Sequence, residues 1–510
     1  MTRIHDTLDA QAAAQGDALA LIDAGGTDLS YASLKTASEE AAQLLRSMGV
    51  RSGDRVVILA ENCAAAVAFI FAASRLGAWA VPVNARLAGP EVDRILAQAT
   101  PRAVVLTVAV SSDAAAHAER LKAAGRRGAY GDVAVAAPYP SRPEADDEIA
   151  VMLFTTGTTG LPKGVMLTHA NLRFAGRASA ELRGMRPGEI VYGALPMTHV
   201  FGLASMVMAA SHAGAAIRLE ARFSPEALYR ALTEGVTLLP AVPQMHALLM
   251  QYTQAQGHES LRQGALRYVS SGAAPLDPVW KRKAEAFYGI PLQNGYGMTE
   301  SSAGISATAN RIGDPDISVG RPLPGVEVRI DETVGSGGDG VGEVLTRGPH
   351  VMKGYYRNAE ETDKTLEPDG WLHTGDLGRI DPEGRLHIVG RAKELIIRGG
   401  FNVYPQEVEA ALNDHPAVVQ AAVVGRRLKG GDEEVLAFVQ IREPGCVDEA
   451  GLKSHVAQLL SGYKRPERIV IASKLPAAAT GKILKQKLIE TFERELRAAK
   501  TPDRTSEAIG

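Results

Sequence analysis

The sequence predicts an α/β protein with a large N-terminal domain of α/β sheets, a small β-rich subdomain and a small C-terminal α+β domain. Three observations predict this arrangement. Apolar runs typical of buried strands alternate with amphipathic helical stretches through the first part of the chain. Short strands separated by Gly, Pro and Asp then dominate at about residues 315–390. A compact alternation of strands and helices resumes after residue 394.

Size and composition fit a globular enzyme. The chain has 510 residues, and at ~150 residues per domain this length suggests two to four domains. The 55 basic residues nearly balance the 58 acidic ones, so bulk charge gives no reason to expect nucleic-acid or membrane binding. Cys63 and Cys446 are the only cysteines, which excludes a disulfide framework or a cysteine-based metal cluster.

The N-terminal stretch has no apolar core followed by a cleavage site, so no signal peptide is expected and the predicted location is the cytoplasm. The most apolar run, residues 64–83, is broken by Arg75 and Gly77. A buried helix followed by a strand explains this run better than a membrane span.

The first elements support the α/β assignment. Residues 34–49 have the pattern of an amphipathic helix that ends at Gly49. The same rhythm of strands and helices continues to about residue 272, without a repeat of fixed period. The predicted strands are 55–62, 80–84, 102–108, 189–196, 237–242 and 265–272, and a further helix is predicted at 224–235.

The later elements set the domain boundaries. Short strands at 326–330, 342–348 and 385–390 form the β-rich subdomain of about 315–390. Beyond it, Pro405 stands where a first helical turn begins. The predicted organisation is an N-terminal domain at 1–390, a hinge at 391–393, and a C-terminal domain at 394–510 with a disordered tail at about 500–510.

The stretch TTGTTGLPKG at residues 155–164 has the composition of a phosphate-binding loop. Glycines allow close approach of the backbone, successive N–H groups can form an anion nest, and Lys163 adds a positive charge. The Walker pattern fails, because Pro162 precedes the lysine and Gly164 follows it. The flanking residues favour a strand–loop–strand arrangement, with a helix that starts near Thr168.

This loop, FTTGTTGLPKGVMLTHANL, resembles the phosphate loop of the adenylate-forming superfamily. The resemblance continues in order through most of the chain and favours the acyl- and aryl-CoA synthetase branch, such as the 4-coumarate, 4-chlorobenzoate and fatty-acid CoA ligases. The other motifs are PMTHVFG (196–202), SSGAAPL (270–276), NGYGMTE (294–300), GWLHTGDLG (370–378), GRAKELIIRGGFNVYPQEVE (390–409) and ATGKILKQKL (479–488).

The resemblance implies a reaction in two halves, with ATP, Mg²⁺ and CoA. A carboxylate attacks the α-phosphate of ATP to give acyl-AMP and pyrophosphate, and a thiol then displaces AMP. Glu300 matches the family's Mg²⁺-linked glutamate, with Thr158 as a partner, and Asp376 and Arg391 match the ribose contacts. The implied nucleotide-binding residues are Thr155, Thr156, Gly157, Thr158, Thr159, Gly160, Lys163, Gly272, Ala273, Ala274, Asn294, Gly295, Tyr296, Gly297, Asp376, Ile388, Arg391 and Lys482.

Three residues match catalytic positions of the family: Lys482 at the forming acyl-phosphate bond, Thr299 at the α-phosphate and His199 at the acid pocket. The pocket residues include no Lys or Arg to pair with a second carboxylate and no Asp to hold an α-amine. A monocarboxylic acid with an apolar tail, aryl or medium-chain aliphatic, is therefore expected. The acid-binding residues are His199, Val200, Phe201, Leu203, Ser205, Gly297, Met298, Ser302 and Gly304, with Met245 nearby in the predicted pocket.

The thioester half-reaction is assigned to the C-terminal domain and one N-terminal arginine. The resemblance implies rotation of this domain about a hinge at Lys393, which makes it mobile and presents two faces in turn. Glu467 departs from the family pattern, where a lysine is expected for CoA phosphate. The implied CoA-binding residues are Arg86, Arg398, Gly399, Gly400, Phe401 and Arg465.

Other activities stay open at this point. The nearest alternative is a stand-alone adenylating enzyme that loads a carrier protein, and a luciferase-like oxygenase uses the same fold. From another class, the chain could be a nucleotide-binding regulator without catalysis, although a regulator would not need Lys163, Glu300, Asp376, Arg391 and Lys482 together. The expected partners are a small carboxylic acid, ATP and CoA, with no nucleic acid and no membrane span. Sequence leaves the physiological acid and the oligomeric state open, with a homodimer as one option.

Overall fold

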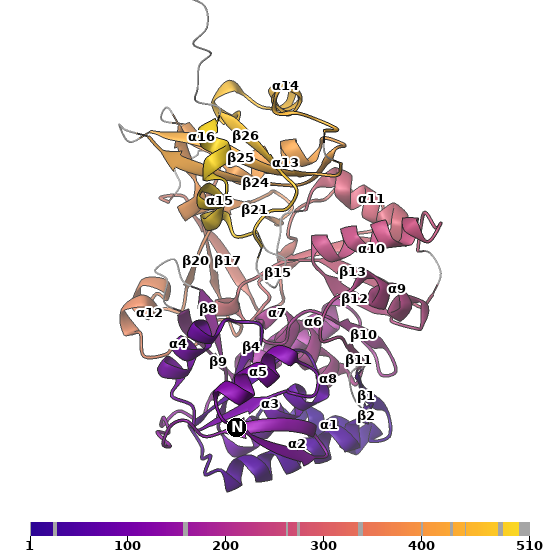
Figure 1. Ribbon diagram of the computed structural model, residues 1–510, viewed down its shortest axis with the longest axis vertical. Helices are drawn as coiled ribbons and strands as arrows, with labels where there is room; N and C mark the ends of the chain where they lie inside the picture. The colour runs from indigo at the N-terminus through magenta and orange to yellow at the C-terminus, as the bar shows by residue number, and fades with distance from the viewer. Residues whose placement is uncertain are drawn as a thin grey trace, which may run out of the picture.

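The computed structural model describes most of the chain, with short gaps. In Figure 1 the large N-terminal part fills the lower half and the right flank, and the C-terminal domain, which carries α13–α16, lies at the top. The tail predicted to be disordered lies outside the described residues. Those residues are 2–23, 28–156, 162–261, 264–272, 276–334, 340–398, 401–428, 432–443, 445–477 and 483–498.

The N-terminal part contains an eight-stranded sheet, in the order β19-β9-β8-β4-β3-β5-β7-β6. Its centre is parallel, where β3 pairs with β4 and β5, and its flanks are antiparallel hairpins. All six residues of β3 are buried and all but Arg55 are apolar, which suits a strand covered on both faces. The strands are β3 (Arg55–Ala60), β4 (Trp79–Asn84), β5 (Ala103–Leu106), β6 (Ala124–Gly128), β7 (Gly131–Ala136), β8 (Ile149–Thr156), β9 (Pro162–Thr168) and β19 (Gly354–Tyr355).

A second sheet of nine strands has the order β16-β15-β14-β13-β12-β10-β11-β1-β2. The strands from β14 to β1 run parallel, so their carboxyl ends share one edge. The strands are β1 (Leu19–Asp23), β2 (Leu29–Ser30), β10 (Ile190–Gly193), β11 (Ala216–Leu219), β12 (Leu238–Ala241), β13 (Tyr268–Ser271), β14 (Leu292–Tyr296), β15 (Ser306–Ala307) and β16 (Arg321–Pro322).

Helices fill the space between the two sheets and cover their outer faces. The largest core joins strands of both sheets, such as Val56 and Val191, through the inner helices α1 (His5–Gln15), α2 (Tyr31–Ser47), α3 (Ala64–Leu76), α6 (His169–Leu182), α7 (Val200–Gly202), η1 (Leu203–Met208) and α8 (Ala209–Ala213). On the outer face of the eight-stranded sheet lie α4 (Gly89–Ala99) and α5 (Ser112–Arg120). On the outer face of the nine-stranded sheet lie α9 (Pro225–Thr233), α10 (Pro243–Ala255) and α11 (Pro278–Tyr288).

The β-rich subdomain is a four-stranded antiparallel sheet in the order β17-β18-β20-β21. Its last strand leads directly into the 3₁₀ turn η3 (Ala392–Glu394), at the predicted hinge. The strands are β17 (Glu327–Asp331), β18 (Gly342–Arg347), β20 (Leu372–Ile380) and β21 (Leu386–Arg391), with α12 (Ala359–Thr365) at the side of the molecule.

The C-terminal domain has its own apolar cores, built around a long β24–β25 hairpin with β26 added in parallel. Pro405 occupies the first turn of α13, as predicted. The elements are β22 (Ile396–Arg398), β23 (Phe401–Val403), α13 (Pro405–Asn413), β24 (Val418–Arg427), β25 (Glu433–Ile441), α14 (Glu449–Leu459), η4 (Gly462–Lys464), β26 (Arg468–Ala472), α15 (Lys485–Thr491) and α16 (Glu493–Ala498).

The apolar run at residues 64–83 forms the buried helix α3 and the strand β4, as predicted. Gly77 ends the helix in the left-handed region, at φ 67°. No helix in the described part of the chain is long and apolar enough to cross a membrane. Cys63 is buried at the start of α3, and Cys446 is exposed.

Candidate active site

The phosphate-loop motif forms a hairpin in the eight-stranded sheet. Thr155 of β8 lies opposite Lys163 of β9, and the side chain of Thr168 caps the N-terminus of α6. The predicted strand–loop–strand arrangement is therefore confirmed. Only the backbone of Thr156 is described, and Gly157, Thr158, Thr159 and Gly160 lie outside the described residues.

Lys163 projects toward a short segment that lies almost two hundred residues further along the chain. Its ammonium forms an ion pair with the Glu361 carboxylate of α12 and lies 5.0 Å from the centroid of the Tyr355 ring. The hydrogen bond from Lys163 lowers the pKa of Glu361, so the carboxylate is ionised. The lysine predicted to bind phosphate thus has both an aromatic and an anionic neighbour.

Glu300 lies on the 3₁₀ turn η2 (Thr299–Ser301) and is only 8% exposed. The Tyr355 hydroxyl donates a hydrogen bond of 2.9 Å to Glu300 Oε1. Burial and the Glu300 charge raise the pKa of Tyr355, so its phenol keeps the proton that it donates. A buried carboxylate that contacts the same tyrosine as the phosphate-loop lysine fits the hard oxygen ligands that Mg²⁺ prefers.

Three predicted nucleotide residues come together between the nine-stranded sheet and the β-rich subdomain. The Tyr296 hydroxyl donates to Asp376 Oδ2 at 2.6 Å, and Arg391 Nε pairs with Asp376 Oδ1 at 2.9 Å. Asp376 and Arg391 are also register partners on β20 and β21. The Asp376 charge raises the pKa of Arg391, and burial raises that of Tyr296. A carboxylate presented in this way suits ribose hydroxyls.

The expected adenine wall is described in part. A Cβ at Gly272 would lie 3.0 Å from the Phe201 ring, so the strand end and the acid-pocket helix are in close contact. Asn294 donates its amide to the Ser318 carbonyl at 3.1 Å and accepts from the Gly295 N–H at 2.9 Å. The Asn294 side chain thus links β14 to the segment that precedes β16. Ile388 lies on β21, half-buried, and Ala273 and Ala274 lie outside the described residues.

The predicted acid-binding residues lie on two segments that meet in the core. His199 caps α7, with Nδ1 accepting from the Phe201 N–H at 3.2 Å. Val200, Leu203 and Ser205 are buried on α7 and η1, and Met298 and Ala303 pack against the core cluster that contains Val200 and Leu203. Met245 is buried in the neighbouring cluster on the outer face of this sheet.

The turn after Glu300 is tightly constrained. Ser302 and Ala303 have positive φ values of 52° and 86°, which cost energy for residues with a Cβ. A Cβ at Gly297 would lie 1.9 Å from the Ala303 carbonyl oxygen, and one at Gly304 would lie 2.9 Å from Leu323. The buried Ser302 hydroxyl has no hydrogen-bond partner among the described residues. Such strain often accompanies functional loops.

Arg183 is a buried cation that sequence analysis did not identify. It follows α6, donates to the Ser205 carbonyl in the π-helix η1 and lies over the Tyr268 ring at 5.7 Å. Burial lowers its pKa. A π-helix disturbs the usual ladder of carbonyls, and the guanidinium satisfies one of them.

The predicted CoA residues already have partners in the protein. Arg86 pairs with the buried Glu61 at 2.6 Å. In the C-terminal domain Arg398 donates to the Arg465 carbonyl at 2.7 Å and pairs with Glu467 at 2.9 Å. The Arg465 guanidinium donates to the Leu460 and Ala457 carbonyls, each at 2.9 Å, at the end of α14.

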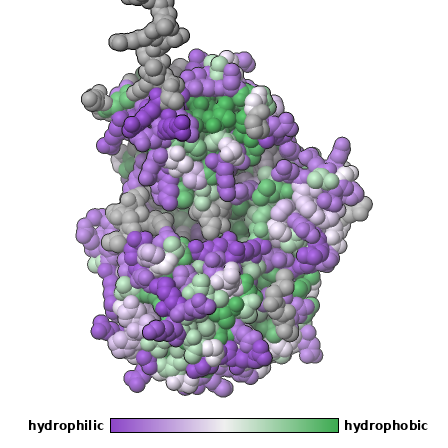
Figure 2. Space-filling model, in the orientation of Figure 1, coloured by the Kyte–Doolittle hydropathy of each residue, from purple (hydrophilic) through white to green (hydrophobic). Residues whose placement is uncertain are grey.

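Of the remaining predicted residues, the structure describes Phe401 and the predicted hinge residue Lys393. Phe401 is 57% exposed and stacks on Tyr463, with ring centroids 4.8 Å apart. Lys393 is exposed on η3, next to Glu394, which pairs with Lys485 at 2.8 Å. Figure 2 shows a recess where the C-terminal domain meets the N-terminal part. Gly399, Gly400 and Lys482 lie outside the described residues.

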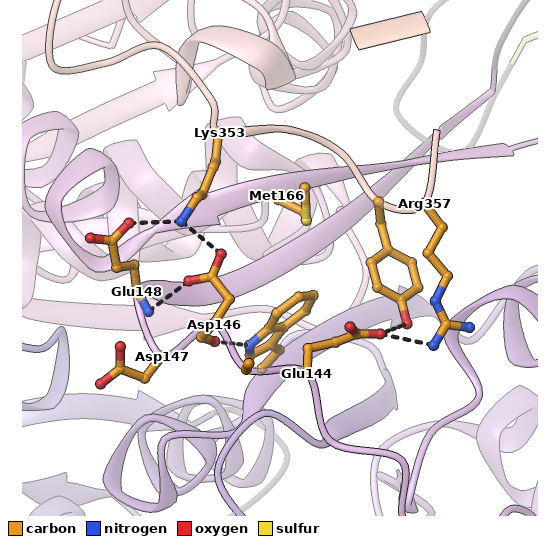
Figure 3. Close-up of a pocket in the computed structure, with 10 residues that line it drawn as sticks. Glu144, Asp146, Asp147, Glu148, Met166, Lys353 and Arg357 are labelled. Carbon is orange, nitrogen blue, oxygen red and sulfur yellow. Dashed lines mark hydrogen bonds and ion pairs between the residues drawn. The ribbon is translucent and has the colours of Figure 1, made fainter. Parts of the chain in front are cut away.

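A separate cavity of about 600 Å³ lies beside β9, and Figure 3 shows its acidic lining. Three of its four carboxylates have close partners among the lining residues. Lys353 pairs with Asp146 and Glu148 at 2.7 and 2.8 Å, and Glu144 accepts from Tyr356 and Arg357, each at 2.8 Å. The acidic character of this cavity therefore does not indicate a cation site.

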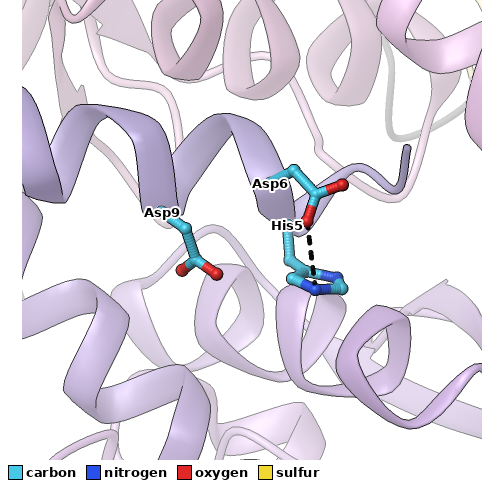
Figure 4. A group of neighbouring side chains, drawn as sticks. All are labelled: His5, Asp6 and Asp9. Carbon is cyan, nitrogen blue, oxygen red and sulfur yellow. Dashed lines mark ion pairs between the residues drawn. The ribbon is translucent and has the colours of Figure 1, made fainter. Parts of the chain in front are cut away.

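His5, Asp6 and Asp9 form a small group on α1 that has the residue types of a metal site (Figure 4). Their ligand atoms have other roles. His5 Nδ1 is hydrogen-bonded to Ser74 at 2.8 Å, and Arg75 binds both Asp9 oxygens. The group joins α1 to α3, which explains its composition without an ion.

Tyr355 and Glu361 were missed by the sequence analysis, although they contact two predicted site residues. They belong to the segment GYYRNAEE, whose paired tyrosines after a glycine were the available signal. Separation along the chain hid their role, because Lys163 and Glu361 are 198 positions apart.

The fold and the site define the class of adenylate-forming enzymes, and family models agree. The model "AMP-binding enzyme" matches residues 8–356, and "AMP-binding enzyme C-terminal domain" matches residues 407–482. The chain belongs to the AMP-binding enzyme family, in its AMP-forming acyl-CoA synthetase branch.

Curated relatives are similar over nearly the whole chain. A feruloyl-CoA synthase of Amycolatopsis sp is 34% identical over 484 residues, which cover 92% of this chain and 95% of the relative. An indoleacetate–CoA ligase of Aromatoleum aromaticum is 33% identical over 503 residues, which cover 92% and 94%.

Solved structures share the fold. ATP-bound MatB from Rhodopseudomonas palustris has a TM-score of 0.81 at 30% identity, covering 96% of this chain and 99% of that one. The o-succinylbenzoate CoA synthetase of Bacillus subtilis, solved with its acyl-adenylate intermediate, has a TM-score of 0.79 at 29% identity, covering 94% and 97%. These similarities confirm the predicted fold class.

Proposed function

We propose that this protein is a cytoplasmic, ATP-dependent carboxylic acid–CoA ligase that activates a monocarboxylic acid with an apolar tail, aryl or medium-chain aliphatic. The observation that carries the proposal is that Tyr296 and Arg391 both contact Asp376. Tyr296 lies shortly before Glu300, which accepts a hydrogen bond from Tyr355. One group suits the ribose and the other suits the phosphates, as the adenylation of a carboxylate requires.

In the first half-reaction a carboxylate oxygen attacks the α-phosphorus of ATP, the bond to the bridging oxygen breaks, and pyrophosphate leaves with the electron pair. Lys163 and the loop at 155–160 hold the β- and γ-phosphates, so that two anions can approach each other. Glu300 and Thr158 would hold Mg²⁺, which supplies charge neutralisation at the phosphates. Asp376 and Arg391 hold the ribose and orient the α-phosphate.

The reacting groups have three further contacts in this proposal. Thr299 contacts the α-phosphate and the carboxylate, and His199 borders the acid. Lys482 stabilises the charge that develops at the forming acyl-phosphate bond. Because Lys482 belongs to the C-terminal domain, that domain must face the nucleotide during this step.

In the second half-reaction the CoA sulfur attacks the acyl carbon, and AMP leaves. Gly399, Gly400 and Phe401 would line the path of the pantetheine arm. Arg86, Arg398 and Arg465 would meet the CoA phosphates, although each now donates to another protein group. The hinge at Lys393 exchanges the face carrying Lys482 for the face carrying these residues.

The apolar side chains at the proposed acid site favour an acid with an apolar tail, and the names of the relatives favour an aryl one among these. Val200, Leu203 and Met298 belong to or pack against one apolar cluster, and the relatives act on feruloyl, 4-coumarate and indoleacetate groups. The alternative is an enzyme that loads the acyl group onto a separate carrier protein.

The test is pyrophosphate release with a panel of aryl, aliphatic and dicarboxylic acids, followed by CoA consumption and detection of the thioester. We expect acid-dependent pyrophosphate release that is strongest with aryl or medium-chain monocarboxylic acids, with stoichiometric use of CoA. Pyrophosphate release without CoA consumption would support the carrier-loading alternative. Release that depends on no acid would contradict both.

A further inference from the structure

Lys163 has an anionic partner of its own within this protein. Its ammonium is paired with Glu361, and the two side chains are only 18% and 29% exposed. A phosphate-binding lysine needs its positive charge for the triphosphate, and the same ammonium cannot bind a carboxylate and a phosphate with full strength at once. The pairing therefore bears directly on nucleotide affinity.

Glu361 is held in place by the helix that carries it. Asn358 caps α12, with Oδ1 accepting from the Glu361 N–H at 3.2 Å. The second carboxylate oxygen of Glu361 lies 3.3 Å from Lys364 Nζ. The carboxylate thus has one lysine on each oxygen, and loss of Lys163 would leave it paired with Lys364.

Tyr355 ties this helix to the other half of the phosphate site. Its N–H donates to Thr362 of α12 at 2.9 Å, and β19 pairs with β9 opposite Val165. Its ring faces Lys163, and its hydroxyl holds Glu300. When the ion pair opens, the ring can still keep the ammonium in place, because cation–π attraction does not use the carboxylate.

We propose that Glu361 is a tethered counter-anion of Lys163, which the β- and γ-phosphates of ATP displace, so that Glu361 lowers the affinity for ATP and leaves that for AMP unchanged. The inference rests on the proposed function, which places Lys163 at those phosphates. AMP lacks both phosphates and is held at Asp376 and Arg391, so it does not compete with Glu361.

The size of the effect follows from a partly exposed ion pair. Such pairs contribute modestly because water and salt screen them. Removal of the Glu361 charge should tighten binding of a triphosphate by about two- to fivefold at low salt. The gain should shrink as ionic strength rises.

The experiment compares the wild type with Glu361→Gln, Glu360→Gln and Lys163→Gln in the full chain. Glu360 is a matched control, because it lies next to Glu361 on α12, is largely exposed and pairs with Lys364 rather than with Lys163. Calorimetry measures the Kd of AMP and of an ATP analogue with a methylene bridge between its α- and β-phosphorus atoms, with Mg²⁺, at low and high salt. AMP binding also reports that each variant is folded.

We expect Glu361→Gln to bind the analogue about two- to fivefold more tightly, with unchanged AMP binding, and Glu360→Gln to match the wild type. Unchanged or weaker analogue binding by Glu361→Gln overturns the counter-anion proposal. An equal gain in affinity for AMP overturns it as well. If Lys163→Gln binds the analogue as well as the wild type does, the proposed phosphate role of Lys163 fails, and the counter-anion fails with it. If Lys163→Gln weakens analogue binding and Glu361→Gln does not tighten it, the counter-anion alone fails.

Discussion

Individual side chains at the centre of this protein form hydrogen bonds and ion pairs with one another, and these contacts determine how each side chain can bind a ligand or a proton. Asp376 accepts from Tyr296 and pairs with Arg391, so one carboxylate organises residues from two sheets. His246 shows the opposite case, a titratable ring that is fully buried between Tyr288 and the Ser270 carbonyl. The first arrangement is the one we propose for nucleotide binding, and the second ties stability to pH.

Asp376→Asn should weaken binding of both AMP and ATP by about 10- to 100-fold, because a charged hydrogen-bond acceptor contributes about 1.5–3 kcal/mol. Calorimetric titration with AMP measures this change. The control is Asp381→Asn, which disrupts the pairs with Arg385 and His387 at the far end of the same hairpin. An equal loss of affinity in the two variants would show that the effect is a general one on the sheet.

Stability should fall as the pH drops from 6.5 toward 4, because burial lowers the pKa of His246 to about 4. Between these values the unfolded chain binds a proton that the folded protein excludes, so the free energy of unfolding decreases with falling pH. Each such histidine contributes a slope of about 1.4 kcal/mol per pH unit. Urea unfolding of His246→Gln from pH 6.5 to 4.5 should give a shallower slope than the wild type; an identical slope would argue against this assignment.

At the scale of elements, close backbone approaches position the site. The β8–β9 hairpin brings Lys163 next to β19. The turn at 297–304, which contains η2, folds back on itself. Pro162 and Thr168 allowed the hairpin and the start of α6 to be predicted from sequence. The π-helix η1 and its contact with Arg183 could not be predicted, because an extra residue in a helical turn leaves no clear periodic signature.

Gly297→Ala should lower the free energy of unfolding by about 1–3 kcal/mol and weaken Mg²⁺-dependent ATP binding. The added Cβ would meet the Ala303 carbonyl, which is backbone and cannot rotate away, so the turn that carries Glu300 must shift. Chemical denaturation and ATP titration measure the two effects. Gly125→Ala, where no atom lies within 4 Å of the added carbon, is the control. If both variants behave alike, the turn is not constrained as described.

At the scale of the whole molecule, the C-terminal domain has separate cores and meets the N-terminal part across a recess. Arg391 ends the last strand of the β-rich subdomain, and η3 follows immediately with Lys393. Glu394, the next residue, is tied to the C-terminal domain through Lys485. A rotation at Lys393 would therefore leave Arg391 with one domain and Glu394 with the other, as the proposed exchange of faces requires.

Lys482→Ala should nearly abolish formation of acyl-AMP and leave transfer from supplied acyl-AMP to CoA largely intact. Gly400→Trp should do the reverse, because the indole would block the path of the pantetheine arm. Rapid-quench measurements of each half-reaction separate the two variants. If both lose both half-reactions to the same degree, one domain does not serve the two steps with different faces.

The sequence by itself determined the family, the order of the motifs and the local form of most elements, because these depend on residues that are neighbours along the chain. It also predicted Lys163, Glu300, Tyr296, Asp376 and Arg391 as site residues. Only the tertiary structure decided which of them meet and what else they contact. The Glu361 partner of Lys163 and the Tyr355 partner of Glu300 come from a segment far along the chain. Such pairings depend on how sheets and helices pack, and no local pattern of residues encodes them.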